Sequence, residues 1–94
     1  GHDHRRETFA LLEYGKAEVL IGKLEDGLST LDGVLQIISE DEPKDFELIV
    51  DIEMRMSTVL RSLGRMDEAN EIDRRLIAVR EAMEDVPAPT DLGD

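Results

Sequence analysis

The chain has 94 residues, three aromatic side chains, no cysteine and a formal net charge of −12. This length predicts one small domain with a thin stability margin, and the lack of cysteine excludes disulfides, thiolate metal sites and thiol nucleophiles. The negative charge argues against nucleic acids and anionic membrane surfaces as partners, because both carry the same sign. No apolar stretch approaches the roughly 20 residues that a helix needs to cross a bilayer.

The start of the sequence is polar and lacks the apolar run of a signal peptide. Because a cysteine-free chain is compatible with a reducing compartment, we expect a cytoplasmic protein. The sequence begins with Gly1 rather than Met, so we expect an excised domain of a longer protein.

Apolar residues recur every three or four positions in four segments, which is the pattern of amphipathic helices. The predicted helices run from about residue 3 or 5 to 21, from 24 to 39, from 43 to 63 and from 67 to 84. Gly22 and Gly64 end the first and third helices, and Pro43 follows the main break in the pattern. No alternating run or hairpin dipeptide supports β-strands.

The fold class predicted from these segments is all-α, with two stacked antiparallel helical hairpins. They span about residues 5–39 and 43–84, within one domain of residues 1–85. Two prolines end the last helix, and we expect the acidic tail of residues 86–94 to be disordered.

The most informative feature is an internal repeat. Residues 22–27 read Gly-Lys-Leu-Glu-Asp-Gly, and residues 64–69, 42 positions later, read Gly-Arg-Met-Asp-Glu-Ala. Both have the order glycine, base, apolar, acid, acid, small. Each copy ends one predicted helix and begins the next, which indicates a helix–turn–helix unit that occurs twice.

These residues make the chain resemble the tetratricopeptide repeat family. The family pattern is matched by Leu11, Tyr14, Gly15, Gly22 and Gly27 in the first copy and by Met56, Ser57, Gly64 and Ala69 in the second. Glu53 and Asp73 depart from it, since bulky apolar residues are usual there, and the spacing exceeds the usual 34 or so. The small residues Gly15, Gly27, Ser57 and Ala69 are the expected helix-packing positions, because they let paired helices approach closely.

The resemblance also implies a concave groove lined by the first helix of each hairpin. The predicted groove residues are Phe9, Leu12, Lys16 and Val19, followed by Asp51, Met54, Arg55, Thr58 and Arg61. Three of these are bases, which suit a carboxylate or an acidic peptide. The alternative is that the bases pair with neighbours on their own helices, as Asp51 could with Arg55 four residues later.

The charges differ between the predicted first and second helices. Residues 1–21 and 46–65 carry a net charge of −1, and the rest of the chain carries −11. In the implied stacking, the groove is nearly neutral and the opposite, convex face is strongly acidic.

We expect neither catalysis, nor a cofactor, nor a metal site. The only histidines are His2 and His4, so neither a Ser-His-Asp set nor a di-metal carboxylate bundle can be assembled. Most carboxylates lie at turns and helix starts, where the helix dipole and water stabilise them. The glycines have no phosphate-loop spacing.

Two functions remain after these exclusions. The first is a protein-interaction scaffold or adaptor that binds a partner peptide or helix in the groove. The alternative is a structural oligomerisation domain, a helical bundle within a larger protein. Two hairpins leave apolar surface uncovered, since repeat arrays generally need three units. We therefore expect either a two-fold homodimer or a fragment of a longer array.

Overall fold

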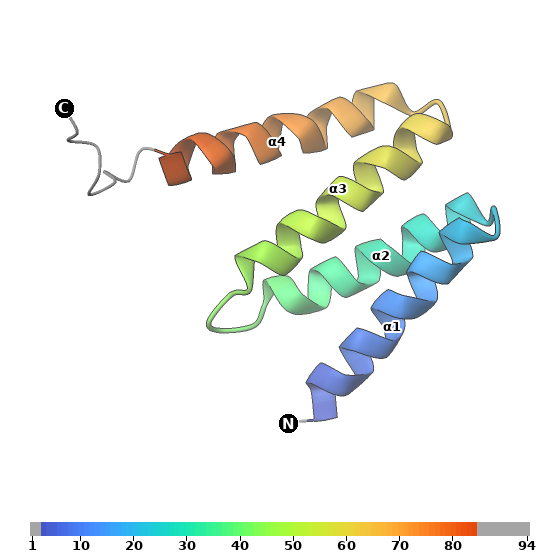
Figure 1. The fold of residues 1–94 in the computed structure, drawn as a ribbon, viewed down its shortest axis with the longest axis horizontal. Helices are drawn as coiled ribbons and strands as arrows, with labels where there is room; N and C mark the ends of the chain where they lie inside the picture. Colours follow the sequence, from blue (N-terminus) through green and yellow to red (C-terminus); the bar gives the residue numbers. More distant parts are fainter. Residues whose placement is uncertain (1–2, 85–94) are drawn as a thin grey trace.

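The computed structural model describes residues 3–84, and all of its regular structure is helical. The helices are α1 (Asp3–Leu20), α2 (Leu24–Ser39), α3 (Phe46–Ser62) and α4 (Met66–Glu84). Along the chain each helix packs against the next, so that α1 with α2 and α3 with α4 form two hairpins (Figure 1). The predicted all-α hairpin fold is confirmed, whereas the tail predicted for residues 86–94 lies outside the described residues.

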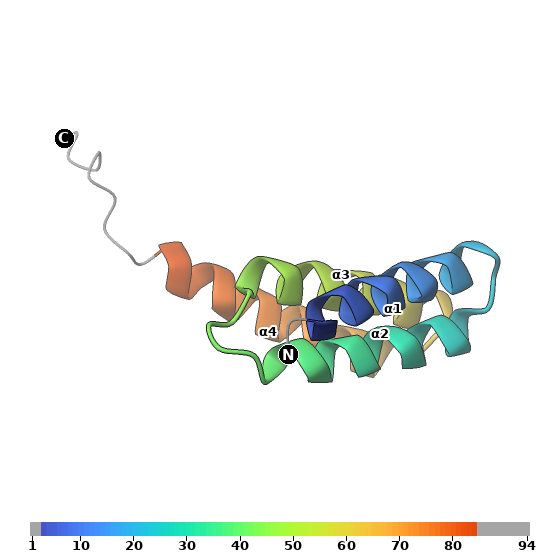
Figure 2. The same cartoon turned by 90° about the horizontal axis from the view of Figure 1, so that it is seen from below.

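The hairpins stack so that equivalent helices share a layer. Figure 2 shows α1 and α3 on one side of the molecule and α2 and α4 on the other. Both tight turns lie at the same end, and the longer α2–α3 connection lies at the opposite end (Figure 1). Within residues 3–84, none of the helices is long and apolar enough to cross a membrane.

The two turns have the same backbone geometry. Gly22 and Gly64 have φ angles of +89° and +80°, a left-handed conformation that costs glycine little and other residues more. The backbone N–H of Lys23 donates to the carbonyl of Glu18 at 2.8 Å. In the second turn, the N–H of Arg65 donates to the carbonyl of Leu60 at the same distance. These bonds satisfy carbonyls at the helix end, as in a Schellman motif. The repeat seen in the sequence is therefore a repeated turn.

The start of α3 differs from the prediction. The sequence pattern placed it at about Pro43, but the helix begins at Phe46. The Asp45 carboxylate accepts a hydrogen bond from the backbone N–H of Leu48 at 3.1 Å. Asp45 is therefore the residue that caps the helix. The predicted start was wrong because a proline can occupy a loop as well as a first helical turn.

The core lies at the centre of the stack, where α2 and α3 meet. Leu31, Val34 and Ile52 are the largest side chains with almost no exposed surface. The other buried apolar members of the cluster are Leu12, Leu28, Ile38, Met56, Val59, Leu60, Ala69 and Ile72. All four helices contribute, so neither hairpin buries its apolar face alone.

Candidate functional site

A groove opens on the layer formed by α1 and α3. It has a volume of about 770 Å³ and extends to the α2–α3 connection. Its apolar lining consists of Phe9 and Leu12 of α1, Ile38 of α2, Pro43 and Leu48. We call it the α1–α3 groove. Phe9 is 63% exposed although it is a large apolar side chain, so the groove offers an aromatic contact to a partner.

The charged lining of this groove is mainly acidic. Arg5 and Lys16 are its bases, and its acids are Asp41, Glu42, Asp45 and Asp51. Three of these four acids come from the α2–α3 connection, which was expected on the convex face. The groove is therefore acidic and not nearly neutral as expected, because residues of the connection line it.

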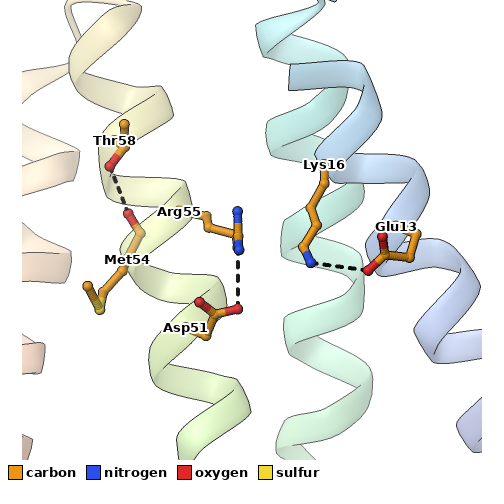
Figure 3. Close-up of polar contacts among 6 residues, drawn as sticks. All are labelled: Glu13, Lys16, Asp51, Met54, Arg55 and Thr58. Atoms are coloured by element: carbon orange, nitrogen blue, oxygen red, sulfur yellow. Dashed lines mark hydrogen bonds and ion pairs between the residues drawn. The ribbon is translucent and has the colours of Figure 1, made fainter. Parts of the chain in front are cut away.

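The structure divides the predicted groove residues between two surfaces. Phe9, Leu12 and Lys16 line the α1–α3 groove. Met54, Thr58 and Arg61 line a separate hollow between α3 and α4. Met54 points toward α4, away from α1 (Figure 3). The division arises because Met54, Thr58 and Arg61 lie on the edge of α3 next to α4, whereas the other three residues lie on α1. The single predicted groove did not distinguish the two edges of α3.

Two further predicted groove residues, Val19 and Arg55, have other surroundings. Val19 is partly buried and packs against the core, so it contributes to the joining of α1 and α2. Arg55 is exposed on α3 and points toward Lys16 of α1 in Figure 3.

Lys16 and Arg55 each pair with a carboxylate of their own helix. Lys16 Nζ lies 3.1 Å from Glu13 Oε2, and Arg55 Nε lies 3.3 Å from Asp51 Oδ2 (Figure 3). The alternative predicted from the sequence, an Asp51–Arg55 pair, is thus present. Exposed pairs of this kind contribute little to stability, but they reduce the charge that the groove offers to an acidic ligand.

Arg61, the third base, is held within the second hairpin. It contacts the Asp73 carboxylate of α4 and donates to Asn70 Oδ1 at 3.2 Å. Ser57 Oγ donates to the other oxygen of Asp73 at 2.7 Å. The two hydrogen bonds, from Ser57 and then Arg61, hold the pKa of Asp73 below its ordinary value. Asp73, which departs from the tetratricopeptide repeat pattern, therefore has a structural role in joining α3 to α4.

Replacing Asp73 with asparagine is expected to lower stability at neutral pH. Because the native pKa of Asp73 lies below its ordinary 3.8, the ionised carboxylate stabilises the fold above that pH. The contribution is lost as the pH falls through the native value. Urea unfolding of both chains should give a difference at pH 7 that starts to decrease only below about pH 4, and that vanishes once the pH is below the native pKa of Asp73. The exposed Glu71→Gln change on the same helix is the control, and an equal response would contradict the assignment.

Glu53, the other residue that departs from the repeat pattern, is also paired across the α3–α4 hairpin. Its side chain is buried, and Oε2 lies 3.5 Å from Arg75 Nη2. A comparable contact in the first hairpin is the hydrogen bond that Thr30 donates to the buried Glu18 at 2.7 Å. Sequence reasoning missed Glu18, although an acid among apolar neighbours in the first helix was a visible signal.

The predicted packing positions lie where the paired helices meet. A Cβ atom on Gly27 would lie 2.6 Å from Val19 Cγ2, and one on Gly15 would lie 3.1 Å from Thr30 Cγ2. Ser57 and Ala69 are buried in the second hairpin. The first hairpin thus has the closer approach, since it has glycine at both positions.

Comparisons with known proteins identify no relative. No protein-family model matches the sequence, and neither the curated proteins nor the solved structures contain a significant match. Among the residues that the structure describes, no cluster of three or more His, Asp or Glu side chains could hold a metal ion.

Proposed function

We propose that the chain is a protein-interaction module, a scaffold or adaptor without catalytic activity or cofactor. In this proposal a peptide or helix of a partner protein binds in the α1–α3 groove. The observation that carries it is the exposed Phe9 above an apolar lining that includes Leu12 and Leu48. Aromatic side chains at such positions are frequent anchors of protein interfaces. The repeated helical hairpin, with its resemblance to tetratricopeptide repeats, supports the same function.

The charges of the groove favour a basic partner. Four acids and two bases line it, and Lys16 already contacts Glu13. The whole chain carries a net charge of −12, which attracts cationic segments at long range. We therefore propose an amphipathic segment with apolar side chains on one face and Lys or Arg on the other. This replaces the acidic peptide expected from the sequence.

The test uses two designed helical peptides of equal length, one of leucine and lysine and one of leucine and glutamate. Titration into ¹⁵N-labelled protein is expected to shift amide signals of Phe9, Leu12, Lys16 and Leu48 with the lysine peptide only. Phe9→Ala should weaken this binding about tenfold or more, because loss of an interface anchor costs about 2 kcal/mol or more and about 1.4 kcal/mol is tenfold in affinity. The control is Leu20→Ala, since Leu20 is exposed but does not line the groove.

Two results would contradict the proposal. One is equal binding of both peptides, which would show that charge does not select the ligand. The other is an unchanged affinity of Phe9→Ala, which would place the binding surface elsewhere.

A further inference from the structure

The 42-residue repeat allows α1 and α3 to be compared position by position. The buried and partly buried positions along α3 and its C-cap include Ile52, Glu53, Met56, Val59 and Leu63. The residues 42 positions earlier are Ala10, Leu11, Tyr14, Ala17 and, just after the helix end, Ile21, and we call these five the outer face of α1. All five are exposed, and Tyr14 and Ile21 are 61% and 70% exposed. The outer face of α1 is thus the equivalent of a packing face, but it has no cover.

The complementary surface recurs at the other end of the stack. The α3–α4 hollow has a volume of about 650 Å³ and an apolar lining of Val50, Met54, Leu76, Ile77 and Val79. The residues 42 positions earlier are Thr8, Leu12, Val34, Leu35 and Ile37. Of these, Leu12 and Val34 belong to the core that α3 completes, and Leu35 packs against it. The hollow is thus the repeat of the surface on which α3 packs.

We propose that the outer face of α1 from a second copy of this chain docks in the α3–α4 hollow. The contact would repeat between copies the packing of α3 on the first hairpin within each copy. It is a heterologous, head-to-tail contact, so further copies can add at both ends. It involves neither Phe9 nor the other apolar residues of the α1–α3 groove and is independent of the proposed peptide binding.

Charge complementarity supports this occupant. Glu7 on α1 is equivalent to Ile49, which lies 42 positions later. Arg80 at the hollow is equivalent to Ile38, which lies 42 positions earlier. The two isoleucines lie in or against the core cluster. Neither Glu7 nor Arg80 has an ion-pair partner among the described residues. Docking in the repeat register would place Glu7 of one copy at the position equivalent to Ile49 and Arg80 of the other at the position equivalent to Ile38, so the interface would gain one acid and one base.

A two-fold contact between the α1 faces of two copies explains less of the surface. It would cover Tyr14 and Leu11 but leave Ile77, which is 51% exposed, and the rest of the hollow open. The head-to-tail contact covers both surfaces with one interface. It differs from the two-fold homodimer, which was one of the two arrangements expected from the sequence.

The test uses the full chain and two variants that each block one side. Tyr14→Glu places a charge on the outer face of α1, and Ile77→Glu places one in the hollow. Light scattering over a hundredfold dilution is expected to show that the unaltered chain forms species larger than a dimer. Each variant alone should be monomeric. A mixture of the two should form a 1:1 pair with twice the mass of the 10.6 kDa chain, because only one intact interface remains.

Leu20→Glu is the matched control, since Leu20 is 84% exposed on α1 but lies off the outer face. It should associate like the unaltered chain, and circular dichroism should show equal helix content in all variants. A monomeric unaltered chain at every concentration would overturn the proposal. So would association of Ile77→Glu alone, which would indicate a two-fold contact through α1.

Discussion

Replacing Gly27 with leucine is expected to destabilise the fold by forcing the first hairpin apart. A Cβ atom at Gly27 would lie 2.6 Å from Val19 Cγ2 and 3.1 Å from the backbone nitrogen of Val19. The side chain could fit only if α1 and α2 moved apart, which would open the core around Leu12 and Leu31. Overpacking of this kind costs about 1–3 kcal/mol or more. A domain of this size has only about 5 kcal/mol of stability, and each kcal/mol lost lowers the melting temperature by about 4–8 °C, so it should fall by about 4–24 °C.

Gly33→Leu on the same helix provides the matched control. Gly33 is exposed, and a Cβ atom there would have no neighbour within 4 Å. Because leucine has the higher helix propensity, this change should raise stability by about 0.5–1 kcal/mol. Thermal unfolding followed by circular dichroism measures both variants. Equal melting temperatures would show that the close approach at Gly27 does not hold the hairpin together.

Replacing Leu31 with aspartate is expected to abolish folding at neutral pH. Leu31 has no exposed surface, and in the repeat register it corresponds to Asp73 of the second hairpin. Asp73 has two partners, Ser57 and Arg61. At their equivalent positions the first hairpin has Gly15 and Val19, which cannot donate side-chain hydrogen bonds. A carboxylate at position 31 would therefore be buried without a partner, which costs several kcal/mol.

The reverse change, Asp73→Leu, is expected to leave the protein folded. Asp73 is only partly buried, and replacing a paired polar residue with an apolar one of similar size is often nearly neutral. Arg61 would keep its contact with Asn70. Circular dichroism spectra and urea unfolding at pH 7 should separate the two variants. A folded Leu31→Asp chain would contradict the equivalence between the two hairpins.

The sequence was sufficient to predict the helices and the turns. Gly22 and Gly64 follow long amphipathic stretches, and in the structure both adopt the left-handed conformation. These features are local, because a glycine at a helix end and a period of three or four residues depend on near neighbours. Among the helix boundaries, the clear error was the start of α3, and its cause is also local. Asp45 caps the helix, so the helix begins at Phe46 and not at Pro43.

The candidate site was only partly predictable. Phe9, Leu12 and Lys16 do line one groove, since their spacing along α1 places them on one side of that helix. Met54, Thr58 and Arg61 belong to another surface, because helical spacing defines a face but not the neighbour that covers each edge. The acidic mouth of the groove was missed because it depends on where the connection of residues 40–45 folds.

By itself, the sequence determined that this chain forms four amphipathic helices, with two equivalent turns 42 residues apart and no thiol or mid-chain imidazole for catalysis. Only the tertiary structure decided which equivalent positions are covered. Met56 is buried while Tyr14 is exposed, although both occupy the same place in the repeat. The reason is that α3 has a hairpin on one side and its own partner helix on the other, whereas the same face of α1 has no helix packed against it. Repetition in a sequence specifies equivalent surfaces, and stacking determines which of them remain available for binding.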